Sequence, residues 1–456
     1  MCLSYNLLIL STNKLILLMP LFIVFCGIIL LFALIVFGKF NAFVSFILVS
    51  LVIGFLNGMP LNDVIKSIEN GFGNTLGSLV MILGLGAMFG KIIAESGAAQ
   101  QISFKLIDSF GVKNIQIAVM LSGFIIGLTM FYEVGFVILV PLIFTVASSS
   151  NLPLMYVGLP LLASLSVAHG YLPPHPGPTA VAVLFDADIG KTLIYGIFVA
   201  IPAIIISGPI LSKVIKKVDA KPLKSFLSSK ILVKSELPSF FISIFSALLP
   251  VFLIGFSTIF LAFTNDENKF YNYIKFIGNP SVALLISLIF SIYSLGLSRG
   301  KNINEIMIKC SNSIKGVTMV LLIIAGSGAL KEILIDSGVS QYIGSLLKGS
   351  SLSPLFLGWA IATLIRVFVG SATVAALTSA GILVPIITTT EINPELMVLA
   401  IGSGSIMLSH VNDGGFWLFK EYFNVSVKDT LSTWTVMETS IGIIGIIGVL
   451  ILDIFV

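Results

Sequence analysis

The sequence predicts an all-α protein that crosses a membrane many times, because apolar residues dominate and charged residues are few. Of its 456 residues, 57% are hydrophobic and 10% are charged, and the mean hydropathy is +1.10. A soluble globular protein carries about 25% charged residues, so this chain cannot coat a water-facing surface. At about 20 residues for each spanning helix, its roughly 260 apolar residues suffice for about 10–14 membrane segments. The apolar runs are continuous, whereas membrane strands alternate apolar and polar residues.

The first apolar run, residues 15–38, predicts a spanning helix rather than a signal peptide. It is too long for a signal core, and it lacks an Ala-x-Ala cleavage site. The three cysteines, Cys2, Cys26 and Cys310, are scattered and odd in number, so they predict no disulfide framework.

A basic segment, residues 213–236, divides the chain into two halves, residues 20–212 and residues 237–456. This segment holds seven lysines against two acidic residues. The positive-inside rule favours a cytoplasmic loop here, and nucleic-acid binding is not favoured. If the loop and Lys39 both lie inside, the first span of the second half runs outward and that of the first half runs inward. The halves are therefore predicted to have inverted topologies.

Sequence matches between the halves support such a repeat. Glu95–Ile102 resembles Asp336–Ile343 at an offset of 241 residues. His169 and His410, two of only three histidines, meet at the same offset, as do a proline pair and a serine pair. Inverted repeats are typical of secondary transporters, whose substrate site lies near mid-membrane between the halves.

One helix in each half is predicted to be broken inside the membrane. His169–Pro178 contains four prolines and two glycines, which no continuous helix tolerates, yet apolar residues flank it on both sides. Irregular backbone at membrane depth persists only where it is buried in protein or lines a cavity. An extramembrane loop is the alternative, but it does not explain the matched breakpoint at Ser409–Gly415. Two broken helices at equivalent positions point to a transport site.

Several long motifs carry a family resemblance. They are Gly86–Gln100, Phe131–Phe136, His169–Pro178, Gly370–Ala376 and Ser409–Phe423. On these motifs, residues 20–456 resemble the gluconate permeases of the gluconate:proton symporter (GntP) family. Residues 1–19 have no counterpart in the family pattern, so they are expected to be a dispensable or misassigned N-terminal extension.

The resemblance implies proton-coupled import of gluconate or a related sugar acid across the bacterial cytoplasmic (inner) membrane. It also implies the ion-transporter superfamily fold, in which each inverted repeat contains a re-entrant hairpin and a broken helix. Gly370–Thr373 resembles a hairpin tip of that superfamily. Residues 131–141 occupy the equivalent place in the first repeat but lack the Ser-Ala-Thr triplet.

A sugar acid needs an anion site and several hydroxyl partners, which broken helix ends and hairpin tips offer. The predicted substrate-binding residues are His169, Gly170, Pro173, His175, Arg366, Gly370, Ser371, Thr373, Ser409, His410 and Asn412. An arginine inside the membrane is costly and functional by default, so Arg366 is a candidate partner for the substrate carboxylate. Its alternative role is to reach out to the membrane surface.

Glu133 and Asp413 are the candidate proton carriers, since a buried carboxyl group can exchange a proton during transport. Glu133 has an alternative role as the partner of a buried cation, and His169 and His410 are further titratable candidates. No cofactor is predicted, and no metal site, because the histidines lack the usual ligand spacing.

Other functions are disfavoured. The expected partners are a small organic anion, a proton and the lipid bilayer, with a homodimer compatible with the fold. Within carriers, the open alternatives are glycerate, D-serine, fructuronate, or a carboxylate coupled to sodium. A membrane enzyme lacks any supporting motif, since Gly402–Ser405 does not have nucleophile-elbow spacing. A channel would not need matched broken helices.

Overall fold

The computed structural model describes residues 22–31, 33–215, 218, 220, 232–264, 269–339, 353–389, 392–411 and 413–456. The predicted extension at residues 1–19 and most of the basic segment lie outside these residues. The described part of the first half forms helices α2 (Ala42–Leu56), α3 (Leu61–Glu95), α4 (Ala98–Phe110), α5 (Ile115–Gly127), α6 (Tyr132–Ser149), α7 (Leu154–Tyr171), α8 (Pro176–Leu184), α9 (Ile189–Ile205), η3 (Ile206–Ile210) and α10 (Leu211–Ile215).

The second half repeats much of this order. It forms α11 (Phe240–Ala262), α12 (Tyr271–Gly278), α13 (Pro280–Leu295), α14 (Ile303–Asp336), α16 (Pro354–Val369), α17 (Ala372–Thr389), α18 (Pro394–Ser405), α19 (Gly414–Phe423), α20 (Val427–Thr430), η7 (Leu431–Thr435) and α21 (Val436–Leu452). The described residues contain no strand, which confirms the all-α prediction.

Helix starts follow the capping rules. Asn41, Asn302 and Asn393 each precede a helix and accept a hydrogen bond from a backbone N–H in its first turn, at 2.8–3.0 Å. Such caps satisfy donors that the helix itself leaves without a partner. Pro280 and Pro354 occupy first positions, where proline's missing N–H costs nothing.

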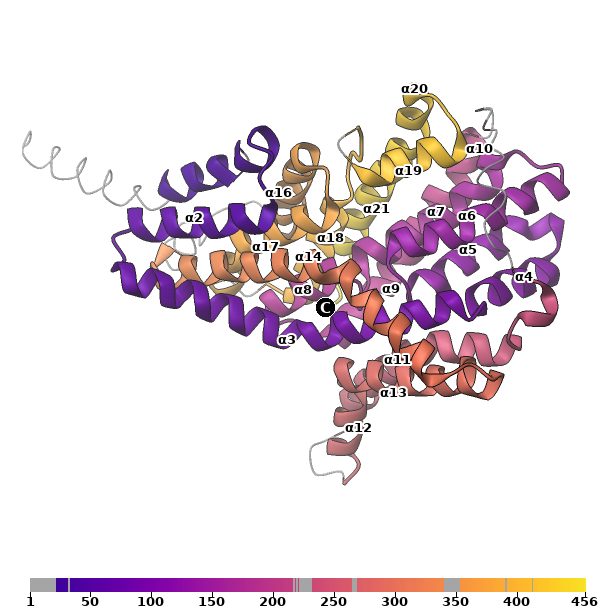
Figure 1. Ribbon diagram of the computed structural model, residues 1–456. Coiled ribbons are helices and arrows are strands. Elements are labelled where there is room, and N and C mark those ends of the chain that lie inside the picture. The colour runs from indigo at the N-terminus through magenta and orange to yellow at the C-terminus, as the bar shows by residue number, and fades with distance from the viewer. Residues whose placement is uncertain are drawn as a thin grey trace, which may run out of the picture.

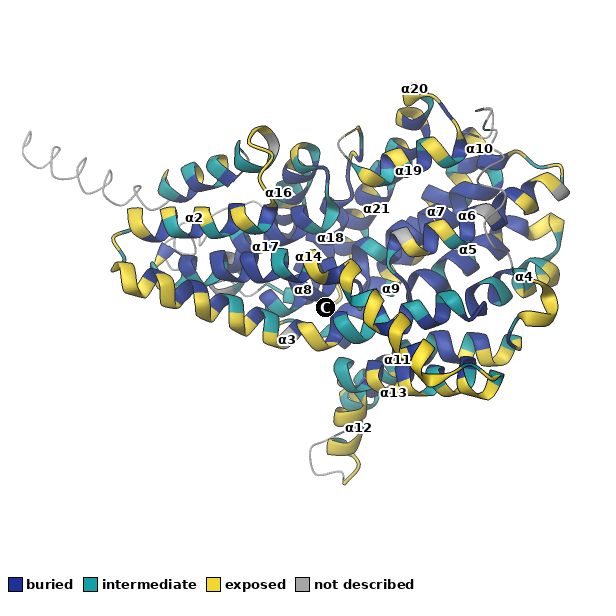
Figure 2. Ribbon diagram, viewed as in Figure 1, coloured by how far each residue is buried: buried dark blue, intermediate teal, exposed yellow. Residues whose placement is uncertain are grey.

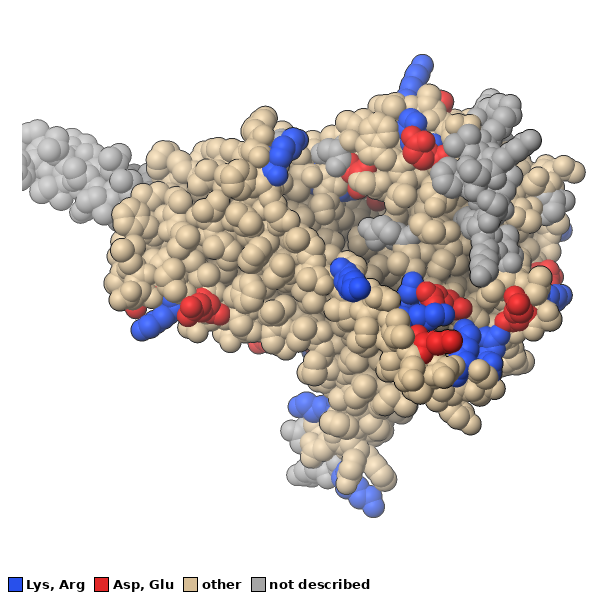
Figure 3. Space-filling view, viewed as in Figure 1, with Lys and Arg blue, Asp and Glu red and all other residues tan. Residues whose placement is uncertain are grey.

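Many of these helices suit a membrane. Among the described residues, seven helices are long and apolar enough to cross one, α4 and the segment after it form a pair bent by 110°, and five more apolar helices are shorter. Large apolar side chains such as Phe241 (80% exposed) and Phe252 (61%) point outward from α11. Most of the face in Figure 3 is uncharged, with charged side chains in a few small groups. These features confirm a multi-pass membrane protein.

The element order supports a repeat. The starts of α3, α5, α6, α7 and α8 fall within three residues of the starts of α14, α16, α17, α18 and α19 at an offset of 241. The pairs α5–α6 and α16–α17 occupy the places of the predicted hairpins. The opposite orientation of the halves stays a prediction. In Figure 1, α2 and α17 lie towards one end of the molecule and α4, α5 and α6 towards the other.

Both predicted helix breaks are present, and the first of them is largely buried. Residues 172–175 separate α7 from α8, and residues 406–413 separate α18 from α19. The most apolar stretch of Leu154–Leu184 is 89% buried, against 33–56% for the other long apolar helices, and α7 and α18 lie within the dark blue interior of Figure 2. Burial contradicts the extramembrane-loop alternative for His169–Pro178.

The two broken helices touch at a pair of glycines. A Cβ atom added to Gly402 of α18 would lie 2.3 Å from the carbonyl oxygen of Gly170 on α7. Helices in membranes approach this closely only where small residues meet. Gly170, a predicted substrate-binding residue, is buried at this contact. We therefore expect Gly402→Ala to destabilise the protein by about 1–3 kcal/mol, because backbone has to shift.

Thermal unfolding of the purified protein in detergent measures this loss. Gly316→Ala is the matched control, since Gly316 also lies inside a helix but an added Cβ there has no neighbour within 4 Å. Equal melting temperatures for the two variants would contradict the close contact between α7 and α18.

Candidate functional site

The link between α16 and α17 is a tight hairpin tip. Gly370 ends α16 with φ of +77°, a left-handed conformation that favours glycine. The hydroxyl group of Ser371 then accepts a hydrogen bond from the backbone N–H of Val374 at 3.4 Å, which caps the start of α17. Two residues thus reverse the chain and leave the start of α17 facing the interior.

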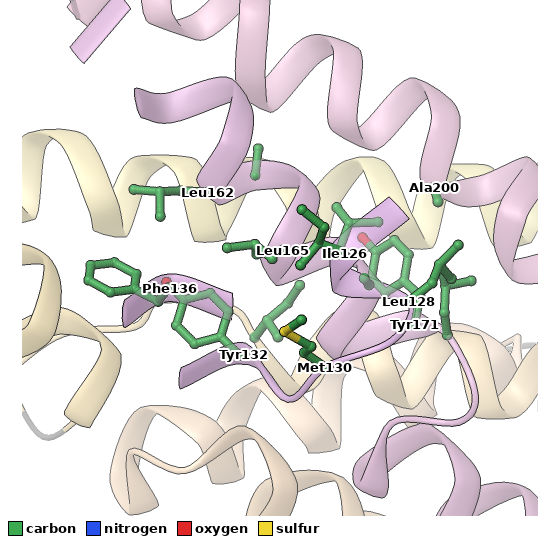
Figure 4. Close-up of a cluster of buried hydrophobic side chains, with 14 of the residues drawn as sticks. Ile126, Leu128, Met130, Tyr132, Phe136, Leu162, Leu165, Tyr171 and Ala200 are labelled. Carbon is green, nitrogen blue, oxygen red and sulfur yellow. The ribbon is translucent and has the colours of Figure 1, made fainter. Parts of the chain in front are cut away.

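The corresponding link between α5 and α6 packs against α7. Figure 4 shows Leu128 and Met130 of this link, with Tyr132 at the start of α6, in one buried cluster with Leu165 of α7. A Cβ atom added to Gly135 of α6 would lie 3.0 Å from the Leu165 side chain. This packing places the start of α6 beside the broken helix of its own half.

Arg366 joins the hairpin tip to the second broken helix. Its side chain is 3% exposed, which contradicts the alternative that it reaches out to the membrane surface. One guanidinium nitrogen lies 2.5 Å from a carboxylate oxygen of Asp413, and another donates to the Gly370 carbonyl. Asp413 also accepts from Ser409 and, at 3.0 Å, from the backbone N–H of Gly415, so it caps α19. A single buried ion pair therefore holds both irregular segments in register.

These segments line a cavity of about 380 Å³. Its lining residues are Tyr132, Ser166, His169, Arg366, Val369, Gly370, Ser371, Ala372, Thr373, Ile406, Asp413, Gly414, Gly415, Leu418, Trp434 and Glu438. The first residues of α6, α17 and α19 are all among them. A helix N-terminus carries partial positive charge and N–H groups without helical partners, so three of them meeting at one cavity favour a bound anion.

The structure brings six predicted residues together at this cavity. They are His169, Arg366, Gly370, Ser371, Thr373 and Asp413. Ser409 and His410 lie behind the lining. Ser409 bonds to Asp413, and the ring Nε2 of His410 lies 2.9 Å from the Val367 carbonyl.

The other predicted residues lie elsewhere. Pro173 and Gly170 are buried but do not line the cavity. His175 is 3% exposed, with its ring 5.5 Å from that of His169 and its Nε2 against the Gly127 carbonyl. Asn412 and the side chain of Glu133 lie outside the described residues.

Ten lining residues are absent from the predicted site, and four of them carry polar side chains: Tyr132, Ser166, Trp434 and Glu438. Trp434 is 3% exposed, and its indole N–H donates to Ser409 at 2.7 Å. Glu438 did leave a signal, because it is the one charged residue between Asp429 and Asp453. An acidic residue inside an apolar helix is by default functional.

No group of three or more metal-ligating side chains occurs in the described part of the chain. A buried polar cavity between broken helices, inside an apolar helical bundle, is the arrangement of a membrane transporter. The sequence model of the GntP family permeases matches residues 19–455, and the chain belongs to this family.

Similar proteins agree with this assignment. The chain is 48% identical to a high-affinity gluconate transporter and to the Gnt-II system L-idonate transporter of Escherichia coli K12, in each case over 95% of this chain and 99% of the relative. It is 44% identical to the gluconate permease of Bacillus subtilis 168, over 96% of this chain and 100% of the relative. The chain is therefore a transporter and not an enzyme.

Two solved structures share the fold. The Alcanivorax borkumensis YdaH transporter aligns with a TM-score of 0.63 at 15% identity, covering 91% of this chain and 97% of its own. Neisseria gonorrhoeae MtrF aligns with a TM-score of 0.62 at 15% identity, covering 90% and 94%. At this low identity, both structures support the fold of this chain and nothing more specific.

Proposed function

We propose that this protein is a secondary active transporter that imports gluconate or a closely related sugar acid, together with protons, across the bacterial cytoplasmic membrane. The observation that carries the proposal is the cavity at the starts of α6, α17 and α19. Partial positive charge from three helix ends suits one carboxylate.

The remaining lining suits a polyol. Ser371 and Thr373 on one wall and Ser166 and His169 on another offer hydroxyl and ring groups that can donate or accept hydrogen bonds. The cavity volume of about 380 Å³ is within the range of small-molecule sites, about 300–1,000 Å³. The carboxylate would lie at the helix ends and the hydroxyl groups along these walls.

The relatives narrow the substrate class. Two relatives that are equally identical to this chain are named as transporters of gluconate and of L-idonate. These two sugar acids are epimers. Hydrogen bonds to individual hydroxyl groups are the feature that can separate epimers, so the choice depends on a few cavity side chains. Glycerate, D-serine and fructuronate, and sodium in place of the proton, stay as alternatives, and so does a homodimer.

Cotransport of a proton has an energetic reason. Moving one negative charge into a negative interior against 100 mV costs about 2.3 kcal/mol. One accompanying proton cancels this cost, and the pH gradient then drives accumulation.

Proteoliposomes test the proposal. Labelled D-gluconate should accumulate under an imposed inside-alkaline pH gradient without sodium, and a protonophore should abolish the accumulation. Liposomes without protein provide the baseline. Accumulation that needs sodium would contradict the proposed proton coupling. Uptake of glycerate or D-serine without uptake of gluconate or L-idonate would contradict the proposed substrate.

A further inference from the structure

Glu438 is a buried carboxyl group that lines the cavity and forms no ion pair with a described residue. Its side chain is 3% exposed and lines the cavity from α21. One carboxylate oxygen lies 2.5 Å from the hydroxyl group of Ser166 on α7. Within the described residues, no lysine, arginine or histidine lies at ion-pair distance from it, whereas Asp413 pairs with Arg366. The cavity thus holds one neutralised carboxylate and one that is not.

The surroundings of Glu438 contain few charges. Helices α7, α9, α16 and α18 and the short π-helices η3 and η7 pack against α21. Arg366, Asp413 and Tyr171 are close enough to interact electrostatically with Glu438, and His169 lines the same cavity. The hydroxyl group of Tyr171 is engaged by the Ile441 carbonyl. The other titratable side chains of these helices lie in first or second turns and do not line the cavity: Tyr156, Lys191, Tyr195 and Glu395.

We propose that Glu438 binds the coupling proton. This inference rests on the proposed function above. The proton adds to a carboxylate oxygen of Glu438 from water on one side of the membrane and returns to water on the other. Ser166 suits both states, because a hydroxyl group can donate to the carboxylate and accept from the carboxylic acid.

Charge balance explains why the proton and the anion would travel together. Arg366 and Asp413 sum to zero, so the empty cavity with ionised Glu438 carries one negative charge. The cavity with a monovalent anion and protonated Glu438 carries the same charge. An anion beside ionised Glu438 would place two negative charges in about 380 Å³, which opposes binding. The loaded cavity and the empty cavity would therefore cross the membrane with the same charge.

Asp413 differs in its partners. It accepts from Arg366, Ser409 and the backbone N–H of Gly415, so its protonation would break the pair that holds the site together. The sequence-based prediction that Glu133 or Asp413 carries the proton is tested by the same assays on Glu133→Gln and Asp413→Asn. We expect Asp413→Asn to lose exchange as well as accumulation.

The test compares two assays in proteoliposomes, using D-gluconate. Glu438→Gln should retain exchange of labelled for unlabelled gluconate to within about tenfold of wild type, because exchange needs no net proton movement. Its accumulation under an inside-alkaline pH gradient should fall to the level of a protonophore-treated sample. Glu395→Gln is the matched control, since Glu395 is also buried (7% exposed) but lies outside the cavity. It should accumulate gluconate like wild type.

Wild-type accumulation by Glu438→Gln would overturn the inference. If this variant does not fold, proton uptake by the wild type decides the point. When gluconate is added to purified protein in a weakly buffered solution of a pH-indicator dye, the protein should take up about one proton for each bound anion. Gluconate binding without proton uptake would equally overturn the inference. Failure of the wild type to exchange gluconate would contradict the proposed substrate instead, and L-idonate would then serve as probe in both assays.

Discussion

Replacing Arg366 by methionine is expected to abolish transport and to destabilise the protein by about 3–5 kcal/mol. The change removes one partner of a buried ion pair and leaves the Asp413 carboxylate without compensation, which costs about this much. It also removes the bond from the guanidinium to Gly370 at the hairpin tip. Uptake in proteoliposomes and thermal unfolding in detergent measure the two effects.

A double variant separates stability from transport. Arg366→Met combined with Asp413→Leu removes both charges, and replacing a whole buried pair by apolar residues is often neutral for stability. Stability should therefore return while transport stays lost. Lys420→Met breaks the partly exposed pair with Glu421 and should cost less than about 1 kcal/mol. Wild-type transport by Arg366→Met would contradict the role of this residue in the site.

Replacing Ser371 by aspartate is expected to abolish gluconate binding with little change in stability. Aspartate caps a helix about as well as serine, so the start of α17 should persist. Its carboxylate would enter the cavity where the substrate carboxylate is expected. Two charges about 5 Å apart repel by about 3 kcal/mol at an effective dielectric constant of about 20, which corresponds to about a 100-fold loss of affinity.

Ser371→Asn is the matched control, because asparagine has nearly the same shape and capping ability but no charge. It should bind gluconate to within about tenfold of wild type. Calorimetric titration of the purified variants measures the affinities. Equal binding by the aspartate and asparagine variants would show that no anion lies near the hairpin tip.

The sequence supported predictions best where residues conflict with their surroundings. Prolines at His169–Pro178 and the polar run at Ser409–Gly415 cannot continue an apolar helix, so the breaks were predictable. Arg366 was predictable for the same reason, since a buried guanidinium inside a membrane must have a partner. The structure adds that its partner is Asp413.

Predictions from sequence were weakest for residues whose role depends on another segment. Gly170 resembles a helix breaker, but its place is decided by Gly402, 232 positions later. Trp434 belongs to a residue type common at membrane surfaces, and only packing against α19 and the bond to Ser409 bring it to the cavity. Ser166 resembles any serine in an apolar helix until Glu438 lies beside it.

The central claim is that the cavity at the starts of α6, α17 and α19 binds the sugar acid. An experimental structure of the full chain determined with D-gluconate tests this claim most directly. The account predicts ligand density inside the cavity, with the carboxylate towards the first residues of α17 and α19 and hydroxyl groups near Ser166 and His169. Gluconate density at another place, with this cavity empty, would contradict it.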